Sequence, residues 1–228
     1  MRTHGSTRPD LEDARVVIVG VGGLGSPAAI ALADAGVGTI GLVDPVRVEP
    51  SNLHRHPLYG DADVGRLKVE AAAVRFEAGS AALLADFDLV VDGTDSVAAK
   101  FDVNDAAVAA RIPLCHAGAI GWQAQLLSVL PGTTACYRCL FEEPPPPDEV
   151  PSCQAAGVLG PAVVLAGSLQ AAEAVRLLGG MSPLFADRLL VIDTRSGSWR
   201  RIAVTRRPGC PACGSLHQYP ITQRSIAR

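Results

Sequence analysis

A glycine-rich turn between an apolar strand and a helix constrains the fold of this chain most strongly. Residues 15–20 (RVVIVG) are a continuous apolar run ending in glycine, as expected of a parallel strand buried on both faces. Residues 24–37 have helical apolar spacing, and Ser26 and Pro27 suit the first turn of that helix. The glycines of the turn are Gly20, Gly22, Gly23 and Gly25. This order predicts the first unit of a doubly wound α/β sheet.

An acidic residue closes the second predicted strand, residues 39–44. Asp44 stands nineteen residues after Gly25. Glycines let the backbone approach phosphate, the helix N-terminus favours negative charge, and the acid can accept hydrogen bonds from ribose hydroxyls. The sequence therefore predicts a nucleotide site and leaves the nucleotide open. A tight turn without a ligand is the alternative.

Hydroxyl, amide and cationic side chains follow Asp44, namely Ser51, Asn52, Arg55 and Lys68. Transfer at the α-phosphate of ATP needs cations beside the phosphate chain, whereas a dinucleotide needs fewer. Arginine offers a planar fork of donors and lysine a point charge, and both suit phosphate oxygens. This set favours ATP over NAD. The alternative is a solvated loop and an exposed helix face.

Two aspartates lie at the end of a third predicted strand, in residues 88–95 (DLVVDGTD). Ligands of open α/β sheets bind beyond the carboxyl ends of the strands. A carboxylate at Asp92 or Asp95 could hold Mg²⁺, which prefers oxygen ligands. The alternative is that Asp95 caps the helix that starts near Ser96.

Two Cys-x-x-Cys pairs predict a structural zinc site with four thiolate ligands. They are Cys136 with Cys139 and Cys210 with Cys213. Unrelated core residues or a redox motif are the alternatives. Cys115 is expected in the core. Cys153 follows a proline-rich loop and is a candidate nucleophile or persulfide acceptor, although exposure alone does not make a thiolate.

The remaining segments complete a mixed sheet. We expect a helix at 96–110, a strand at 113–119, an antiparallel or half-exposed strand at 122–131, a long helix at 160–180 and a closing hairpin. Four consecutive prolines make residues 142–152 a loop. The predicted class is α/β, with a Rossmann-like, doubly wound, mostly parallel sheet continued by antiparallel strands. One domain spans residues 1–228, with a flexible segment 1–14 and a C-terminal tail 215–228.

Composition excludes several classes of function. A net charge of −3 and a pI near 5.9 give no electrostatic footprint for nucleic acid or an anionic membrane. No apolar run is long enough to predict a membrane span, and the N-terminus lacks a secretory signal. We expect a cytoplasmic protein with reduced cysteines. His54, His56 and His116 have no visible partner, and we expect structural or peripheral roles for them.

Taken together, these motifs resemble the ThiF/MoeB family, the bacterial relatives of ubiquitin-activating enzymes. The resemblance runs from Arg15 to Gly214 and covers nearly the whole chain. The matching strings are residues 15–44, SNLHR at 51–55, 63–72, 88–95, 113–132, CYRC at 136–139, 153–178 and PGCPACG at 208–214.

The resemblance implies an adenylyltransferase that uses ATP and Mg²⁺ to activate the C-terminal Gly-Gly carboxylate of a ubiquitin-like sulfur-carrier protein. A separate sulfur donor would then give a thiocarboxylate. By this resemblance the glycine turn and Asp44 hold adenosine and ribose, and Asp95 holds Mg²⁺. The phosphates would be held by Asn52, Arg55 and Lys68. The four paired cysteines match the family's zinc site, and Cys153 matches the cysteine of its crossover loop. Members are usually homodimers.

The chain also departs from the family pattern. Nothing before Arg15 matches the usual Arg-Tyr-x-Arg-Gln string, His56 stands where glutamine is usual, and Ser96 follows Asp95 where asparagine is frequent. These departures keep an alternative open, in which the chain binds a carrier or a partner subunit without turning over ATP. A third reading, an NAD-dependent oxidoreductase, explains the glycines but neither the cations nor the cysteines.

Overall fold

The computed structural model describes residues 9–71, 84–146 and 157–216. Its strands are β1 Arg15–Val19, β2 Thr39–Val43, β3 Leu89–Asp92, β4 Leu114–Ile120, β5 Gln123–Val129, β6 Arg188–Asp193 and β7 Ser198–Ala203. Its helices are α1 Gly25–Asp34, η1 Pro50–Arg55, η2 Asp61–Asp63, α2 Lys68–Ala71, α4 Val97–Ala110, α5 Tyr137–Leu140 and α7 Gly160–Leu178, of which η1 and η2 are 3₁₀ helices.

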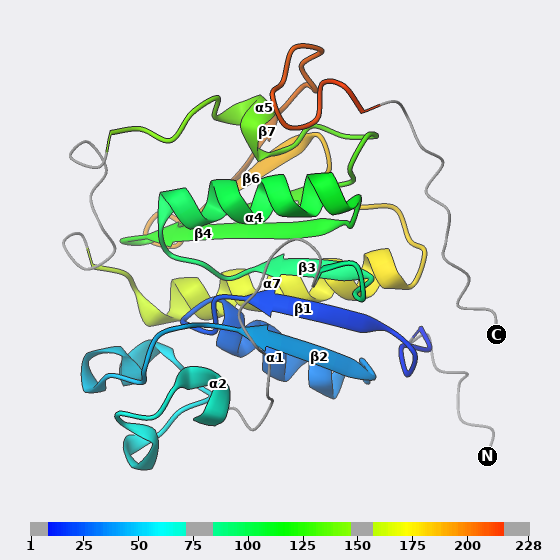
Figure 1. Cartoon of the computed structure of the whole chain (residues 1–228). Coiled ribbons are helices and arrows are strands. Elements are labelled where there is room, and N and C mark those ends of the chain that lie inside the picture. Colours follow the sequence, from blue (N-terminus) through cyan, green and yellow to red (C-terminus); the bar gives the residue numbers. More distant parts are fainter. Residues whose placement is uncertain (1–8, 72–83, 147–156, 217–228) are drawn as a thin grey trace, which may run out of the picture.

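The described strands form one sheet in the order β2-β1-β3-β4-β5-β6-β7 (Figure 1). The pairs from β2 to β4 are parallel. The pairs from β4 to β7 are antiparallel. The predicted class, a mostly parallel Rossmann-like half continued by antiparallel strands, is therefore confirmed.

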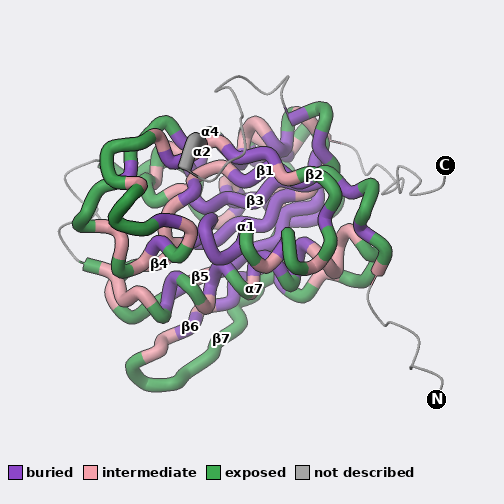
Figure 2. Tube along the Cα trace, turned by 90° about the horizontal axis from the view of Figure 1, so that it is seen from below, coloured by how far each residue is buried: buried purple, intermediate pink, exposed green. Residues whose placement is uncertain are grey.

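Helices cover both faces of the parallel half. Along β1, Val16 and Ile18 pack with α1 and α7, whereas Val17 packs with α4 on the opposite face. Successive side chains of a strand point to opposite faces, so a strand between two helical layers must be apolar throughout. Figure 2 shows the result, a buried sheet inside a shell that is mostly exposed, with the β6–β7 hairpin reaching into solvent.

Helix α7 is long and apolar enough to cross a membrane by length and composition alone. Its inner face instead packs on the sheet, where Gln170 and Glu173 are buried. The Gln170 amide donates to the carbonyl oxygens of Asp92 and Cys115, at 2.8 and 2.9 Å. Buried polar groups that bond the sheet identify α7 as a core helix of this domain.

The N-terminal segment differs in part from the expectation. Residues 1–8 lie outside the described residues, as do residues 217–228 of the expected tail. Leu11 and Ala14, within the segment predicted to be flexible, are each only 2 % exposed and pack against the core. Residues 9–14 are thus part of the fold, because Leu11 supplies apolar surface that the core buries.

Candidate functional site

The glycine turn after β1 packs closely against the end of β3. Gly20 has a φ of +86°, a conformation that side chains rarely adopt. A Cβ on Gly25 or Gly93 would overlap the Gly20 carbonyl oxygen. These positions require glycine because the turn after β1 and the loop after β3 touch through their backbones. Open space remains beside the start of α1, where Gly22 and Gly23 line the cavity.

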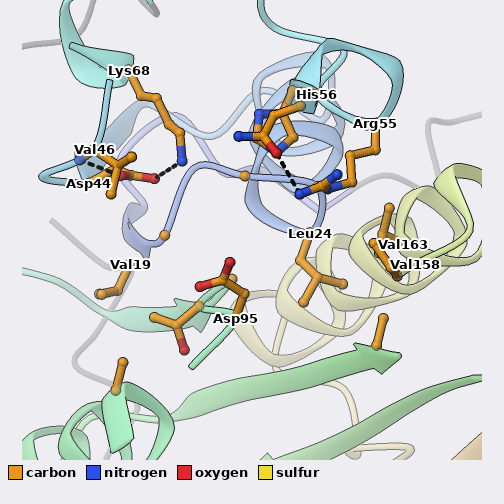
Figure 3. A pocket seen from close by; sticks show the side chains of 18 of the residues that line it. Val19, Leu24, Asp44, Val46, Arg55, His56, Lys68, Asp95, Val158 and Val163 are labelled. Atoms are coloured by element: carbon orange, nitrogen blue, oxygen red, sulfur yellow. Dashed lines mark hydrogen bonds and ion pairs between the residues drawn. The ribbon is translucent and has the colours of Figure 1, made fainter. Parts of the chain in front are cut away.

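A cavity of about 430 Å³ opens at the carboxyl ends of β1, β2 and β3 (Figure 3). Its lining includes the predicted nucleotide-site residues Gly20, Gly22, Gly23, Asp44, Asn52, Arg55, Lys68 and Asp95. Gly25 stands behind the turn, where its role is the close packing just described. Residues far apart in the sequence therefore meet at one site, as predicted.

Asp44 and Lys68 form a buried ion pair on one side of this cavity. The Lys68 ammonium lies 3.1 Å from Asp44 Oδ2, and both side chains are less than 10 % exposed. The amides of Val21 and Val46 donate to the same carboxylate at 2.8 and 2.9 Å. Asp44 thus fixes the glycine turn and the chain after β2, and it holds Lys68 at the cavity wall.

Arg55 is oriented by its neighbour on η1. Its guanidinium donates to Asn52 Oδ1 at 2.6 Å, and both residues line the cavity. A planar fork of donors held by an amide suits the binding of phosphate oxygens. Ser51 is exposed and stands 3.4 Å from Glu49, and it does not belong to the cavity lining.

His56, expected to be structural or peripheral, lines the cavity. Only 4 % of it is exposed, and the described residues offer its buried Nδ1 no hydrogen-bond partner. Burial, reinforced by the charges of Lys68 and Arg55, lowers the pKa of His56 to about 4. Its imidazole is therefore neutral at pH 7.

Asp95 reaches the cavity from the loop after β3, on the side opposite Arg55 and Lys68 (Figure 3). The alternative that Asp95 caps α4 is wrong, because the Ser96 hydroxyl accepts the hydrogen bond from the Ala99 amide. Asp95 faces two cations across the cavity, and a carboxylate in that place is the kind of oxygen ligand that Mg²⁺ prefers.

Asp92 belongs to a buried cluster instead of the cavity. Its Oδ2 lies 2.7 Å from His116 Nδ1 and 3.5 Å from the Lys100 ammonium. Burial acts to raise the pKa of Asp92, but Lys100 and the hydrogen bond from His116 outweigh it and lower the pKa to about 2. His116 is thus a buried structural residue, as expected, and Asp92 is the partner that the sequence does not reveal. Sequence reasoning also missed Lys100, whose burial depends on the packing of α4.

The two cysteine pairs come together beside α5 and the last described loop, at the top of Figure 1. All four sulfur atoms are buried and lie within 4.8 Å of one another. Three of their separations are 3.9, 3.6 and 3.4 Å. Thiolates around a tetrahedral zinc ion with Zn–S bonds of about 2.3 Å stand about 3.8 Å apart. The cluster thus has the geometry of a closed zinc site, with no position left for a substrate.

Cys115 and Cys153 are the two cysteines that belong to neither Cys-x-x-Cys pair. Cys115 is 2 % exposed and belongs to the core, as predicted. Burial raises the pKa of its thiol well above the usual value. Cys153 lies outside the described residues.

Comparison with known protein families tests the resemblance inferred from the motifs. The model of the ThiF family matches residues 3–79 and 74–212 of this chain. The chain belongs to the ThiF family. The family assignment confirms the resemblance inferred from the motifs.

Curated relatives cover almost the same length. The sulfur carrier protein adenylyltransferase of Thermus thermophilus is 42 % identical over 90 % of this chain and 83 % of its own. The Escherichia coli sulfur carrier protein ThiS adenylyltransferase is 38 % identical over 92 % of this chain and 90 % of its own. Other relatives are longer, and the matched part is 49 % of the Sus scrofa adenylyltransferase and sulfurtransferase MOCS3.

Solved structures agree with this result. The crystal structure of E. coli MccB with ATP superposes with a TM-score of 0.76 at 25 % identity. The match covers 90 % of this chain and 68 % of MccB. The fold and the family are thereby shown by independent comparisons.

Proposed function

We propose that this protein is an adenylyltransferase that uses ATP to activate the C-terminal carboxylate of a ubiquitin-like sulfur-carrier protein. The observation that carries the proposal is the cavity, which unites a glycine turn, two cations and an aspartate. Relatives matched over at least four-fifths of their own length are named as adenylyltransferases of sulfur carriers.

The nucleotide would lie across the glycine turn, with its ribose beside Asp44. The backbone of Gly22 and Gly23 lines the cavity without side chains, so phosphate oxygens can approach the start of α1. Arg55, held by Asn52, and Lys68, held by Asp44, would neutralise the phosphate chain from one side. Each cation already has a fixed position, so little reorganisation is needed when charge develops.

The reaction is a displacement at the α-phosphorus of ATP. A carboxylate oxygen of the carrier forms a bond to that phosphorus, and the bond from the α-phosphorus to the oxygen bridging to the β-phosphorus breaks. The products are a carrier acyl-adenylate and pyrophosphate, which leaves with the electron pair of the broken bond. Arg55 and Lys68 would stabilise the charge that builds on the phosphate oxygens.

Two metal ions complete the proposal. Asp95 would hold Mg²⁺, which supplies positive charge beside the triphosphate. Cys136, Cys139, Cys210 and Cys213 would hold Zn²⁺ as a structural centre. Bound zinc would pin the C-terminal loop to α5, because its four ligands come from two segments seventy residues apart.

The setting of the reaction is also a proposal. We expect a cytoplasmic homodimer that receives sulfur from a separate donor, with Cys153 as the candidate thiol for the transfer. Cys153→Ser should then leave adenylation intact and slow thiocarboxylate formation. Equal loss of both activities would contradict this division of labour.

The alternative, a carrier-binding protein without turnover, is less well supported. Arg55, Lys68 and Asp95 line one cavity, an arrangement that suits ATP turnover and that carrier binding alone does not require. ATP–pyrophosphate exchange separates the two readings. We expect exchange that requires a carrier ending in Gly-Gly. Tight carrier binding without exchange would support the non-catalytic reading.

A further inference from the structure

Lys100 is a buried cation that the proposed chemistry does not use. It stands in the second turn of α4 and only 6 % of it is exposed. Its ammonium donates to the carbonyl oxygens of Thr94 and Ala117, both at 2.6 Å. With Asp92 Oδ2 at 3.5 Å, the three protons of the ammonium face three protein acceptors.

The Thr94 carbonyl belongs to the loop that carries Asp95. Asp92, the last residue of β3, also fixes this loop, because its Oδ1 accepts from the Thr94 amide at 2.9 Å and from the Thr94 hydroxyl at 2.6 Å. The Gly93 amide donates to the Val19 carbonyl at 2.8 Å. Lys100 joins this loop to β4 through Ala117.

Lys100 also balances a charge that would otherwise be costly. Asp92 is fully buried, and its neighbour His116 is 1 % exposed. An uncompensated carboxylate at that depth would be expensive to keep ionised. The ammonium thus holds the Asp92 carboxylate and the Thr94 carbonyl in one arrangement, directly beneath the cavity that Lys100 helps to line.

We propose that Lys100 is a positioning residue, which locks the Gly93–Asp95 loop so that the Asp95 carboxylate faces the nucleotide cavity. The inference rests on the proposed function for the role of Asp95. It adds a cation whose ammonium faces three protein acceptors and which acts through Thr94 and Asp92. Loss of the ammonium therefore frees the loop, while Arg55 and Lys68 keep their places.

The test compares Lys100→Met, which keeps the length of the side chain, with Lys100→Arg, which keeps the charge. Val108→Ala is the control, because Val108 is a buried apolar residue two turns further along α4, in a core cluster that contains no residue of the Gly93–Asp95 loop. Thermal midpoint and zinc content are measured for each variant, so that a general loss of folding is recognised.

Metal binding is measured with Mn²⁺ by paramagnetic resonance, with ATP present and no carrier. For Lys100→Met we expect about tenfold weaker Mn²⁺ binding, equal to about 1.4 kcal/mol, and metal-free ATP binding within about threefold of wild type. Lys100→Arg should recover part of the loss, and Val108→Ala should bind Mn²⁺ like wild type. Unchanged Mn²⁺ binding in Lys100→Met, or an equal loss in Val108→Ala, overturns the proposal.

Hydrogen exchange on the ligand-free protein separates this inference from the proposed function. Lys100→Met should speed exchange at the amides of Thr94 and of the residues beside it, with the strands β1 and β2 unchanged. Faster exchange there supports the positioning role even if the wild type binds neither ATP nor Mn²⁺, a result that would refute the proposed function alone. Unaltered exchange at Thr94 refutes the positioning role.

Discussion

Single residues around the cavity show which polar contacts a sequence can predict. Asp44, Asn52, Arg55, Lys68 and Asp95 were predicted as one site, and all of them line the cavity. The pair of Asp92 with His116 was missed because it depends on strand register. The two residues lie directly opposite each other on β3 and β4. Apolar runs in the sequence predict the two strands. Which residues face each other across them is decided only when the strands pack into the sheet.

The first prediction at this scale concerns His56 and pH. Its pKa is about 4 in the folded protein and 6.5 in the unfolded chain, so the unfolded chain binds more protons between these values. Wild type should therefore lose stability as pH falls from 6.5 towards 4, by up to about 3 kcal/mol from this group. His56→Gln cannot titrate and should show a shallower decline.

Denaturant unfolding at several pH values from 4 to 7 measures this difference. Other groups, such as the buried His116, titrate in both proteins and cancel in the comparison. Parallel stability curves for wild type and His56→Gln would show that His56 does not have a lowered pKa.

The second residue-scale prediction concerns the planar fork of Arg55. Arg55→Lys keeps the charge but loses the paired donors that Asn52 orients, so ATP affinity should fall about tenfold. AMP affinity should change much less, because AMP lacks the β- and γ-phosphates. Isothermal titration calorimetry measures both. Arg47→Lys is the matched control, since Arg47 is exposed and bonds the Gly65 carbonyl away from the cavity. Equal losses for ATP and AMP would argue against a contact of Arg55 with the β- or γ-phosphate.

Elements were predicted well where one periodicity dominates. The strand at 15–20 and the helix at 160–180 became β1 and α7 with small changes at their ends. The cavity wall at Pro50–Arg55 is a 3₁₀ helix that no apolar pattern announces. Its place is set by contacts with α7 and with Gly23 of the glycine turn, which are tertiary in origin.

The element-scale prediction concerns α5 and the cysteine cluster. Tyr137 of α5 packs edge-on against Phe101 of α4 and at a tilt against His116, with ring centroids 5.0 and 4.5 Å away. Cys136→Ser should release about one equivalent of zinc and lower the free energy of unfolding by several kcal/mol, because the metal no longer holds α5 to the C-terminal loop. Metal analysis and thermal unfolding measure both effects.

Cys115→Ser is the control for the cysteine cluster, since Cys115 is a buried cysteine outside it. It should keep its zinc although it loses core packing. A wild-type protein that is purified without zinc, and that gains no stability when zinc is added, would contradict the structural role of the cluster.

At the scale of the whole molecule, topology decides where function lies. The carboxyl ends of β1, β2 and β3 meet at the cavity because the strands are parallel, and this could be predicted from the order of the segments. The antiparallel strands extend the sheet to β7. The chain after β7 then brings Cys210 and Cys213 back to α5. Cys153 lies outside the described residues, so its role in sulfur transfer stays a prediction.

The most direct test of the central claim is intact mass spectrometry of a carrier protein incubated with the enzyme, ATP and Mg²⁺. We predict a carrier whose mass increases by one adenylyl group, attached at its C-terminal Gly-Gly. The adduct should be absent with a carrier that lacks the last glycine, and much reduced with the Arg55→Lys enzyme. A carrier that binds the enzyme and ATP together yet never gains the adenylyl group would contradict the account.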